Sequence, residues 1–68
     1  MSTQISMIAA RVDAGISQKE MAKLVDRSNN TVLAWEKGRK APSTTDFYKY
    51  CAACGRDPSE VRIPVVLE

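Results

Sequence analysis

The chain has 68 residues, of which 44% are hydrophobic and 26% are charged, and its formal net charge is +2. A chain of this length forms one domain with a small core, so most of its apolar residues are needed for folding. No apolar run approaches the roughly 20 residues of a membrane-spanning helix, and the N-terminus lacks the charged-then-apolar pattern of a signal peptide. We therefore expect a cytoplasmic protein that has no membrane partner.

The composition also argues against catalysis and metal binding. Histidine is absent, and no paired carboxylates, glycine-rich phosphate loop or nucleophile with a base stand out, so neither an enzyme nor a cofactor is expected. Cys51 and Cys54 form a C-x-x-C pair, but a tetrahedral zinc site needs four ligands. Their spacing places both thiols on one face of a helix. This favours small buried side chains; a dimer that pools four thiols is the alternative.

The first expected helix runs from about Thr3 to Ala14 and ends at Gly15. Its apolar residues fall on two faces, with Met7, Ala10 and Ala14 on one, and Ile5, Ile8 and Val12 on the other. A minimal domain rarely needs two such faces on one helix. We expect the C-terminal tail or another subunit to cover the second face, unless one wide apolar stripe wraps around a single core.

A capping box predicts the start of a second helix at Ser17, because Glu20 follows three residues later. The apolar residues that come next recur on one face at helical spacing: Met21, Ala22 and Val25. The polar stretch Asp26-Arg27-Ser28 then interrupts the pattern.

A third helix is expected directly after this interruption, with Ser28 as its cap. Its inner face carries Val32, Trp35 and, as a further candidate, Thr31. Gly38 suits the left-handed residue that ends a helix, and Pro42 prevents the helix from resuming. Two helices joined by so short a polar turn are typical of the helix–turn–helix motif, whose second helix has an outer face free to enter a groove.

Basic residues gather at the end of this motif. Between positions 27 and 40 there are Arg27, Lys37, Arg39 and Lys40, against the single acid Glu36. A basic run alone is more often a solvated loop. In this helical context, however, it favours binding to phosphates.

The remainder of the chain predicts two more helical segments and a tail. Ser43 and Asp46 form another capping box, which begins a fourth helix that runs to about Cys54 and is closed by Gly55. Its inward residues are Phe47, Tyr50, Cys51 and Cys54. The stretch Asp57-Pro58-Ser59-Glu60 predicts a short fifth helix of about one turn.

The last seven residues, 62–68, are mostly β-branched and apolar, and Pro64 forbids a helix, so we expect an extended tail after a helical domain of residues 1–61. Such a tail needs a partner. It can cover the second face of the first helix, continue into a longer protein, or pair with a second copy through Ile63, Val65, Val66 and Leu67.

The segment Ser17–Ser43 closely resembles the helix–turn–helix of phage repressors and Cro proteins, the XRE-like family. The matching positions are Ser17-Gln18, Glu20, Met21-Ala22, Val25, Ser28, Val32, Trp35-Glu36, Gly38 and Pro42-Ser43. The resemblance implies an all-α, compact lambda-repressor-like bundle of four to five helices that binds double-stranded operator DNA as a homodimer. It also implies that the recognition helix, Ser28–Lys37, lies in the major groove.

The resemblance further implies a role for individual residues. Base edges would be read by Asn29, Asn30 and Ala34, bordered by Thr31 and Leu33. Asparagine can pair with adenine, and alanine can touch a thymine methyl group. The phosphate contacts would be Gln18, Arg27, Ser28, Lys37, Arg39 and Lys40. Arg11 and Glu36 match a pair that bridges the first and third helices.

Two positions depart from the family pattern. Asp26 stands where the family usually has glycine in the turn, and aspartate tolerates the left-handed conformation better than most residues. Arg27 stands where a small apolar residue is usual, and we expect its charge to point outward.

These features together predict a sequence-specific transcription regulator, a phage or prophage repressor of the Cro kind acting on a pseudo-palindromic operator. One alternative is an antitoxin with the same domain, whose tail binds a toxin. Another is the N-terminal domain of a longer repressor.

Overall fold

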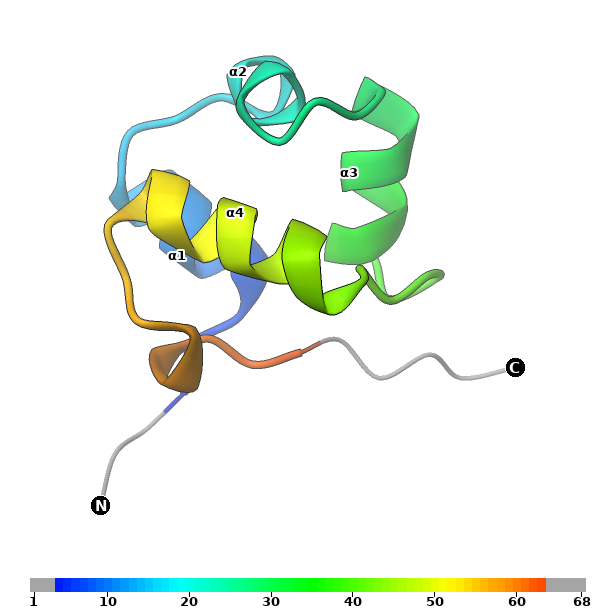
Figure 1. Ribbon diagram of the computed structural model, residues 1–68. Helices are drawn as coiled ribbons and strands as arrows, with labels where there is room; N and C mark the ends of the chain where they lie inside the picture. Colours follow the sequence, from blue (N-terminus) through cyan, green and yellow to red (C-terminus); the bar gives the residue numbers. More distant parts are fainter. Residues whose placement is uncertain (1–3, 64–68) are drawn as a thin grey trace.

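The computed structural model describes residues 4–63, and the regular elements within them are helical (Figure 1). In chain order they are α1 (Met7–Asp13), α2 (Gln18–Leu24), α3 (Asn29–Glu36), α4 (Thr44–Cys54) and a single 3-10 turn, Pro58–Glu60. The all-α bundle of four to five helices that the sequence predicts is confirmed.

Short polar side chains begin each α-helix. The hydroxyl groups that accept a backbone N–H from three residues further along are those of Ser6, Ser17, Ser28 and Ser43. Glu20 returns the contact to the backbone of Ser17, which completes the predicted capping box. Gly55 ends α4 in the left-handed conformation, with φ of 71°. The predicted starts of α2, α3 and α4 are therefore confirmed.

The capping box predicted at Ser43 is only half formed. The Ser43 hydroxyl accepts the N–H of Asp46 at 3.2 Å, as expected. The Asp46 carboxylate instead receives Nε of Arg27, at 3.2 and 3.3 Å from its two oxygens. Asp46 is buried, and a buried carboxylate needs a partner of opposite charge more than a helix end needs a second cap.

The predicted start of the first helix is wrong, because α1 begins at Met7 and residues 4–6 are not helical. Ile5 instead forms a parallel β-bridge with Val61. Its N–H donates to the carbonyl of Glu60 at 3.0 Å, and its own carbonyl accepts the N–H of Arg62 at 2.7 Å. Val61, directly before the tail expected at 62–68, therefore pairs with the segment before α1.

This pairing divides the second apolar face that the sequence analysis assigned to the first helix. Ile5 is half-buried against the core, whereas Ile8 and Val12 are 41% and 63% exposed. Ala14, expected on the inner face, is exposed because α1 ends at Asp13 and Ala14 only caps it. Three of the residues proposed for dimerisation, Val65, Val66 and Leu67, lie outside the described residues.

The core lies between α4 and the other helices. Both α1 and α2 pack on α4, and the 3-10 turn contacts α4 from the other side (Figure 1). The buried hydrophobic residues are Met7, Ala10, Met21, Ala22, Val25, Val32, Trp35, Phe47, Tyr50, Cys51 and Val61. Cys51 is fully buried and burial raises the pKa of its thiol to about 11, while Cys54 packs half-buried beside the core. The interpretation of these cysteines as small buried residues is confirmed for Cys51, whereas Cys54 is only partly buried.

Candidate nucleic-acid interface

The turn between α2 and α3 holds the two helices against each other. Asp26 occupies the left-handed region, with φ of 57°, as its place in the turn predicts. The N–H of Arg27 then closes the turn on the carbonyl of Ala22 at 2.9 Å. The inner side of α3 carries Val32 and Trp35, both buried. This burial fixes which side of α3 is left for solvent.

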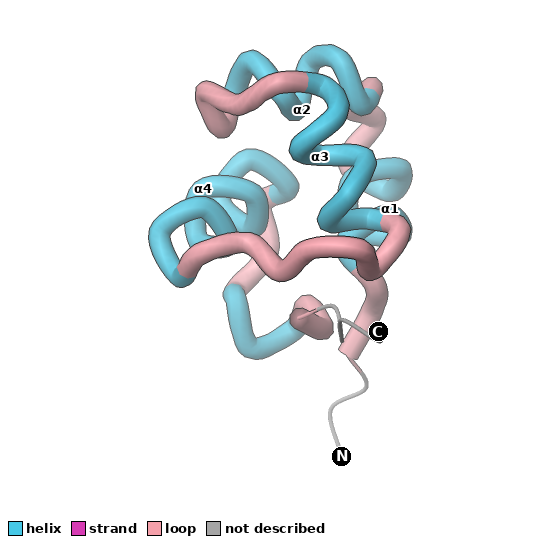
Figure 2. The backbone as a smooth tube through the Cα atoms, turned by 90° about the vertical axis from the view of Figure 1, so that its right-hand side faces the viewer, coloured by secondary structure: helices cyan, strands magenta, loops and turns pink. Residues whose placement is uncertain are grey.

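The outer side of α3 lies at the edge of the molecule. Figure 2 shows α3 and the loop after it on the face turned toward the viewer. At 100° per residue, Asn30, Ala34 and Lys37 point away from Val32 and Trp35. Asn30 and Lys37 are exposed, and Leu33 and Ala34 are half-buried. Asn29 and Thr31 flank this surface on opposite sides, so the predicted base-reading residues form one continuous strip.

A buried ion pair ties α3 to α1. Arg11 Nε donates to Glu36 Oε2 at 2.7 Å, and its Nη2 donates to Oε1 at 3.1 Å. A third donor, Nη1, reaches the carbonyl of Ile16 at 3.0 Å. The Glu36 side chain is only 1% exposed. The structure thus brings together the two residues paired by resemblance, in a two-pronged geometry that fixes orientation as well as charge.

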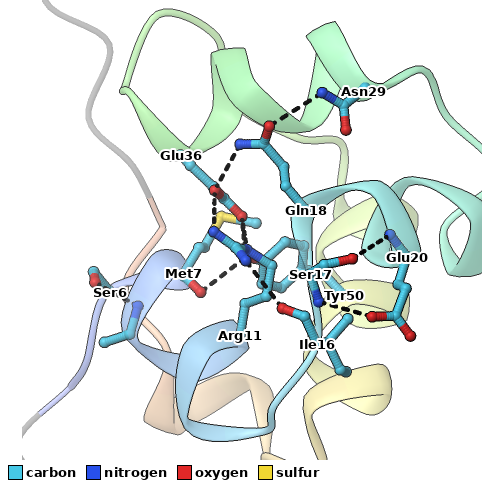
Figure 3. Close-up of polar contacts among 11 residues, drawn as sticks. Ser6, Met7, Arg11, Ile16, Ser17, Gln18, Glu20, Asn29, Glu36 and Tyr50 are labelled. Atoms are coloured by element: carbon cyan, nitrogen blue, oxygen red, sulfur yellow. Dashed lines mark hydrogen bonds and ion pairs between the residues drawn. The ribbon is translucent and has the colours of Figure 1, made fainter.

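Two neutral side chains complete the shell around this carboxylate (Figure 3). The Tyr50 hydroxyl donates to Glu36 Oε2 at 2.5 Å and lies 2.8 Å from the carbonyl of Met7. Gln18 Nε2 donates to Glu36 Oε1 at 3.1 Å. The sequence predicts Tyr50 in the core and Gln18 at a phosphate, but it does not predict that both donate to Glu36. The partners lie on separate helices, so no local spacing reveals them.

Gln18 continues this network to the first residue of α3. Its Oε1 accepts a hydrogen bond from Asn29 Nδ2 at 3.2 Å (Figure 3). Since Glu36 accepts from the Gln18 amide nitrogen, the Gln18 oxygen is directed toward Asn29. One Asn29 proton is thereby committed inside the protein, whereas the second N–H and Oδ1 remain for an outside partner.

The charge states of this network follow from its contacts. Burial by itself raises the pKa of Glu36, but the hydrogen bonds from Arg11, Tyr50 and Gln18 outweigh it and leave the pKa below its ordinary value. The hydrogen bond to Glu36 raises the pKa of Arg11. Burial, followed by the hydrogen bond to Glu36, raises the pKa of Tyr50. All three groups therefore keep one protonation state at neutral pH.

These pKa directions predict how stability depends on pH. Glu36 has a lower pKa in the folded protein than the ordinary 4.5 of an unfolded chain. Its charge therefore stabilises the fold above pH 4.5, and this contribution is lost as the pH falls through the folded value. We expect the urea midpoint of the Glu36→Gln variant to change less between pH 6 and pH 3 than that of the wild type. An equal change of the urea midpoint with pH in the two proteins would contradict this, since all the other carboxylates are common to both.

The opposite flank of α3 carries the second ion pair. Arg27, whose side chain is 51% exposed, donates to the buried Asp46 through Nε. A surface hollow beside this pair is also lined by Thr31, Lys40 and Ser43. Arg27 is therefore exposed, as expected from the sequence, and its ion pair with Asp46 connects it to α4.

The remaining candidate phosphate contacts surround the strip. Lys37, Arg39 and Lys40 are exposed in the turn that follows α3. Ser28 is exposed as well, but its hydroxyl caps α3 and lies 2.9 Å from the hydroxyl of Thr31. The strip thus has Gln18 beside its first residue, Asn29, and exposed cations beyond its C-terminal end.

Two helices crossing over a short turn, with the second one exposed along a polar strip, define this fold as a helix–turn–helix. Residues 7–61 match the family model described as Helix-turn-helix (HTH_3), so the chain belongs to this helix–turn–helix family. The chain is also 36% identical, over 50 residues, to an "Uncharacterized HTH-type transcriptional regulator" of Methanothermobacter thermautotrophicus. That match covers 74% of this chain and 72% of the archaeal protein. Within residues 4–63, no helix is long and apolar enough to cross a membrane.

Proposed function

We propose that this protein is a sequence-specific DNA-binding regulator of transcription, not an enzyme, and that α3 reads the major groove. The observation that carries the proposal is the exposed strip Asn29–Asn30 on a helix whose orientation is set by the buried Arg11–Glu36 pair. Base reading requires hydrogen-bonding groups held in a fixed register. Membership of the helix–turn–helix family and the similarity to a protein described as an HTH-type transcriptional regulator support the same function.

The phosphate contacts fix that register. Lys37, Arg39 and Lys40 lie beyond the C-terminal end of α3 and present charge to a phosphate backbone. Arg27, 51% exposed, adds a further cation beside Lys40. Gln18 is less free than its resemblance implies, since both ends of its amide are engaged. We assign it to the support of Asn29, with any phosphate contact made by its remaining N–H.

The finer proposal is a Cro-like repressor that binds a pseudo-palindromic operator as a homodimer. It rests on the resemblance of Ser17–Ser43 and on the geometry of the motif, because one α3 helix covers only one half-site. Under the antitoxin alternative, the protein would need its partner for tight operator binding. As the N-terminal domain of a longer repressor, it would bind the same half-site.

Selection of bound duplexes from a random pool, with the purified protein alone, tests this proposal. We expect enrichment of two inverted half-sites whose centres lie about one helical turn, roughly 34–36 Å, apart. Enrichment of a single half-site would contradict binding as a dimer, but it would still agree with base recognition by α3. Recovery of unrelated sequences would contradict sequence-specific binding. Tight selection only after a co-expressed partner is added would favour the antitoxin.

The salt dependence of binding separates the phosphate contacts from the base contacts. Each phosphate neutralised by a cation contributes about 0.9 to the slope of log K against log salt. We expect Lys40→Ala to lower the slope by about that amount per subunit and to weaken binding equally on all sequences. The matched control is Arg56→Ala. Arg56 follows the C-terminal end of α4 and pairs with Asp13 of α1, so it is not one of the proposed phosphate contacts. A lowered slope in the control, or an unchanged slope in Lys40→Ala, would contradict the assignment.

A further inference from the structure

Each flank of α3 has a buried carboxylate bound to an arginine, but the two arginines differ in exposure. The Arg11 side chain is 14% exposed, and its Nε, Nη1 and Nη2 all donate to acceptors inside the protein. The Arg27 side chain is 51% exposed, and its Nε donates to both oxygens of the buried Asp46. A guanidinium has five N–H donors, of which Nε carries only one. Arg27 is therefore anchored inside the protein and accessible from solvent at the same time.

The hollow beside Arg27 lies along this flank of α3. It has a volume of about 240 Å³, and its charged and hydroxyl-bearing lining residues are Arg27, Thr31, Lys40, Ser43 and Asp46. Arg27 precedes α3 and Lys40 follows it, and both line this one hollow. Two cations against one carboxylate leave an excess of positive charge, which favours an anion such as a phosphate group.

The anchor of Arg27 changes what a phosphate contact costs. An arginine side chain loses conformational freedom when it binds a partner, and this loss lowers the affinity. The contact with Asp46 removes part of that freedom before any phosphate is bound. Because the guanidinium is planar and rigid, holding Nε also restrains the Nη donors. Arg27 stands where the family usually has a small apolar residue, so this anchor is a feature of this chain and not of the common pattern.

We propose that Asp46 is a positioning residue for DNA binding, which holds Arg27 so that Arg27 and Lys40 together bind one phosphate of the DNA backbone at this hollow. The proposal rests on the proposed function, which assigns both cations to phosphates. It goes further by giving a role in binding to a buried carboxylate, whose own charge repels DNA. Because phosphate contacts carry no sequence information, Asp46 acts on affinity and not on the choice of base.

Asp46→Ala and Asp46→Asn test this role, because charge and positioning predict opposite results. Both variants remove one negative charge, which by itself strengthens binding to DNA. Loss of the anchor weakens it. We expect Asp46→Ala to bind any duplex roughly 2- to 10-fold more weakly than the wild type does. Asp46→Asn keeps one oxygen that can accept from Nε, so it should restore part of the affinity. Affinities are measured below the thermal midpoint that circular dichroism gives for each variant.

Asp13→Ala is the matched control for charge, because it also removes one carboxylate that pairs with an arginine. Asp13 is exposed, pairs with Arg56, and does not line the hollow. We expect this variant to bind DNA at least as tightly as the wild type. A second comparison uses the background Arg27→Gln, whose amide can still donate to Asp46. In this background Asp46→Ala should no longer weaken binding, because the side chain that it positions is gone.

The outcomes separate this proposal from the proposed function. Binding by Asp46→Ala as tight as that of Asp13→Ala would overturn the positioning role, and so would equal weakening with Arg27 and with Arg27→Gln. If Asp46→Ala does not fold, Asp46→Asn in the two backgrounds decides the same question. A wild type that binds no duplex would overturn DNA binding itself. In the first two cases the wild type still binds, so the two failures are distinguishable.

Discussion

Replacement of Glu36 by alanine is expected to destabilise the protein by about 3–5 kcal/mol, the cost of breaking one partner of a buried ion pair. The carboxylate accepts hydrogen bonds from Arg11, Tyr50 and Gln18, and its side chain is 1% exposed. Alanine leaves the guanidinium, 14% exposed, without its counter-charge. A domain of this size is held by only roughly 3–10 kcal/mol, so we expect this variant to be largely unfolded at 37 °C.

Urea unfolding followed by the fluorescence of Trp35 and by circular dichroism measures this loss. The matched control is Asp13→Ala, which removes a carboxylate that pairs with an arginine at the surface. That pair, with Arg56, is at the surface, where Asp13 is 67% exposed. Exposed pairs contribute about 0–1 kcal/mol. A similar loss of unfolding free energy in the two variants would show that the buried contacts of Glu36 contribute no more to stability than an exposed ion pair does.

Features that act within three residues of the chain were predictable from the sequence. Ser17, Ser28 and Ser43 each begin a helix where expected, because a capping hydroxyl needs only the backbone N–H three residues further along. The same rule explains the error at the first helix. Ser6 offers a cap directly before Met7, but the apolar spacing of Ile5 favoured a longer helix. The bridge between Ile5 and Val61 joins residues 56 positions apart, and no local pattern reports it.

The candidate site shows the same division. The sequence predicted the polar residues on the third helix and the basic residues in the turn after it, and family resemblance supplied the Arg11–Glu36 pair. The hydrogen bonds and ion pair that support these residues could not be predicted, because they depend on how the helices pack. Gln18 lies between Glu36 and Asn29 only once α2 has packed on α3. Asp46 meets Arg27 only once α4 lies beneath the turn. Apart from the Arg11–Glu36 pair, the contacts that hold the reading side chains are therefore the part of the site that the sequence does not predict.

The two asparagines of the reading strip differ, because Asn29 donates a hydrogen bond to Gln18 and Asn30 is directed toward solvent. Asn30 is exposed and points directly away from the core, so both its amide groups can face a base edge. Loss of a two-pronged base contact costs about 1–3 kcal/mol. We expect Asn30→Ala to weaken binding to the selected operator by roughly 5- to 150-fold, and to leave binding to a scrambled duplex of equal length unchanged.

Asn29→Ala should differ in a measurable way, because Asn29 also donates to Gln18. Its removal frees Gln18 Oε1 and loosens the link to Glu36, so we expect a small loss of stability in addition to weaker operator binding. Titration of both variants against the operator and the scrambled duplex at one salt concentration, together with their urea midpoints, resolves the two effects. Equal weakening on both duplexes for Asn30→Ala would mean that α3 meets DNA with a different face. An unchanged urea midpoint for Asn29→Ala would mean that Gln18 is held by Glu36 alone, and that Asn29 is as free to read a base as its neighbour.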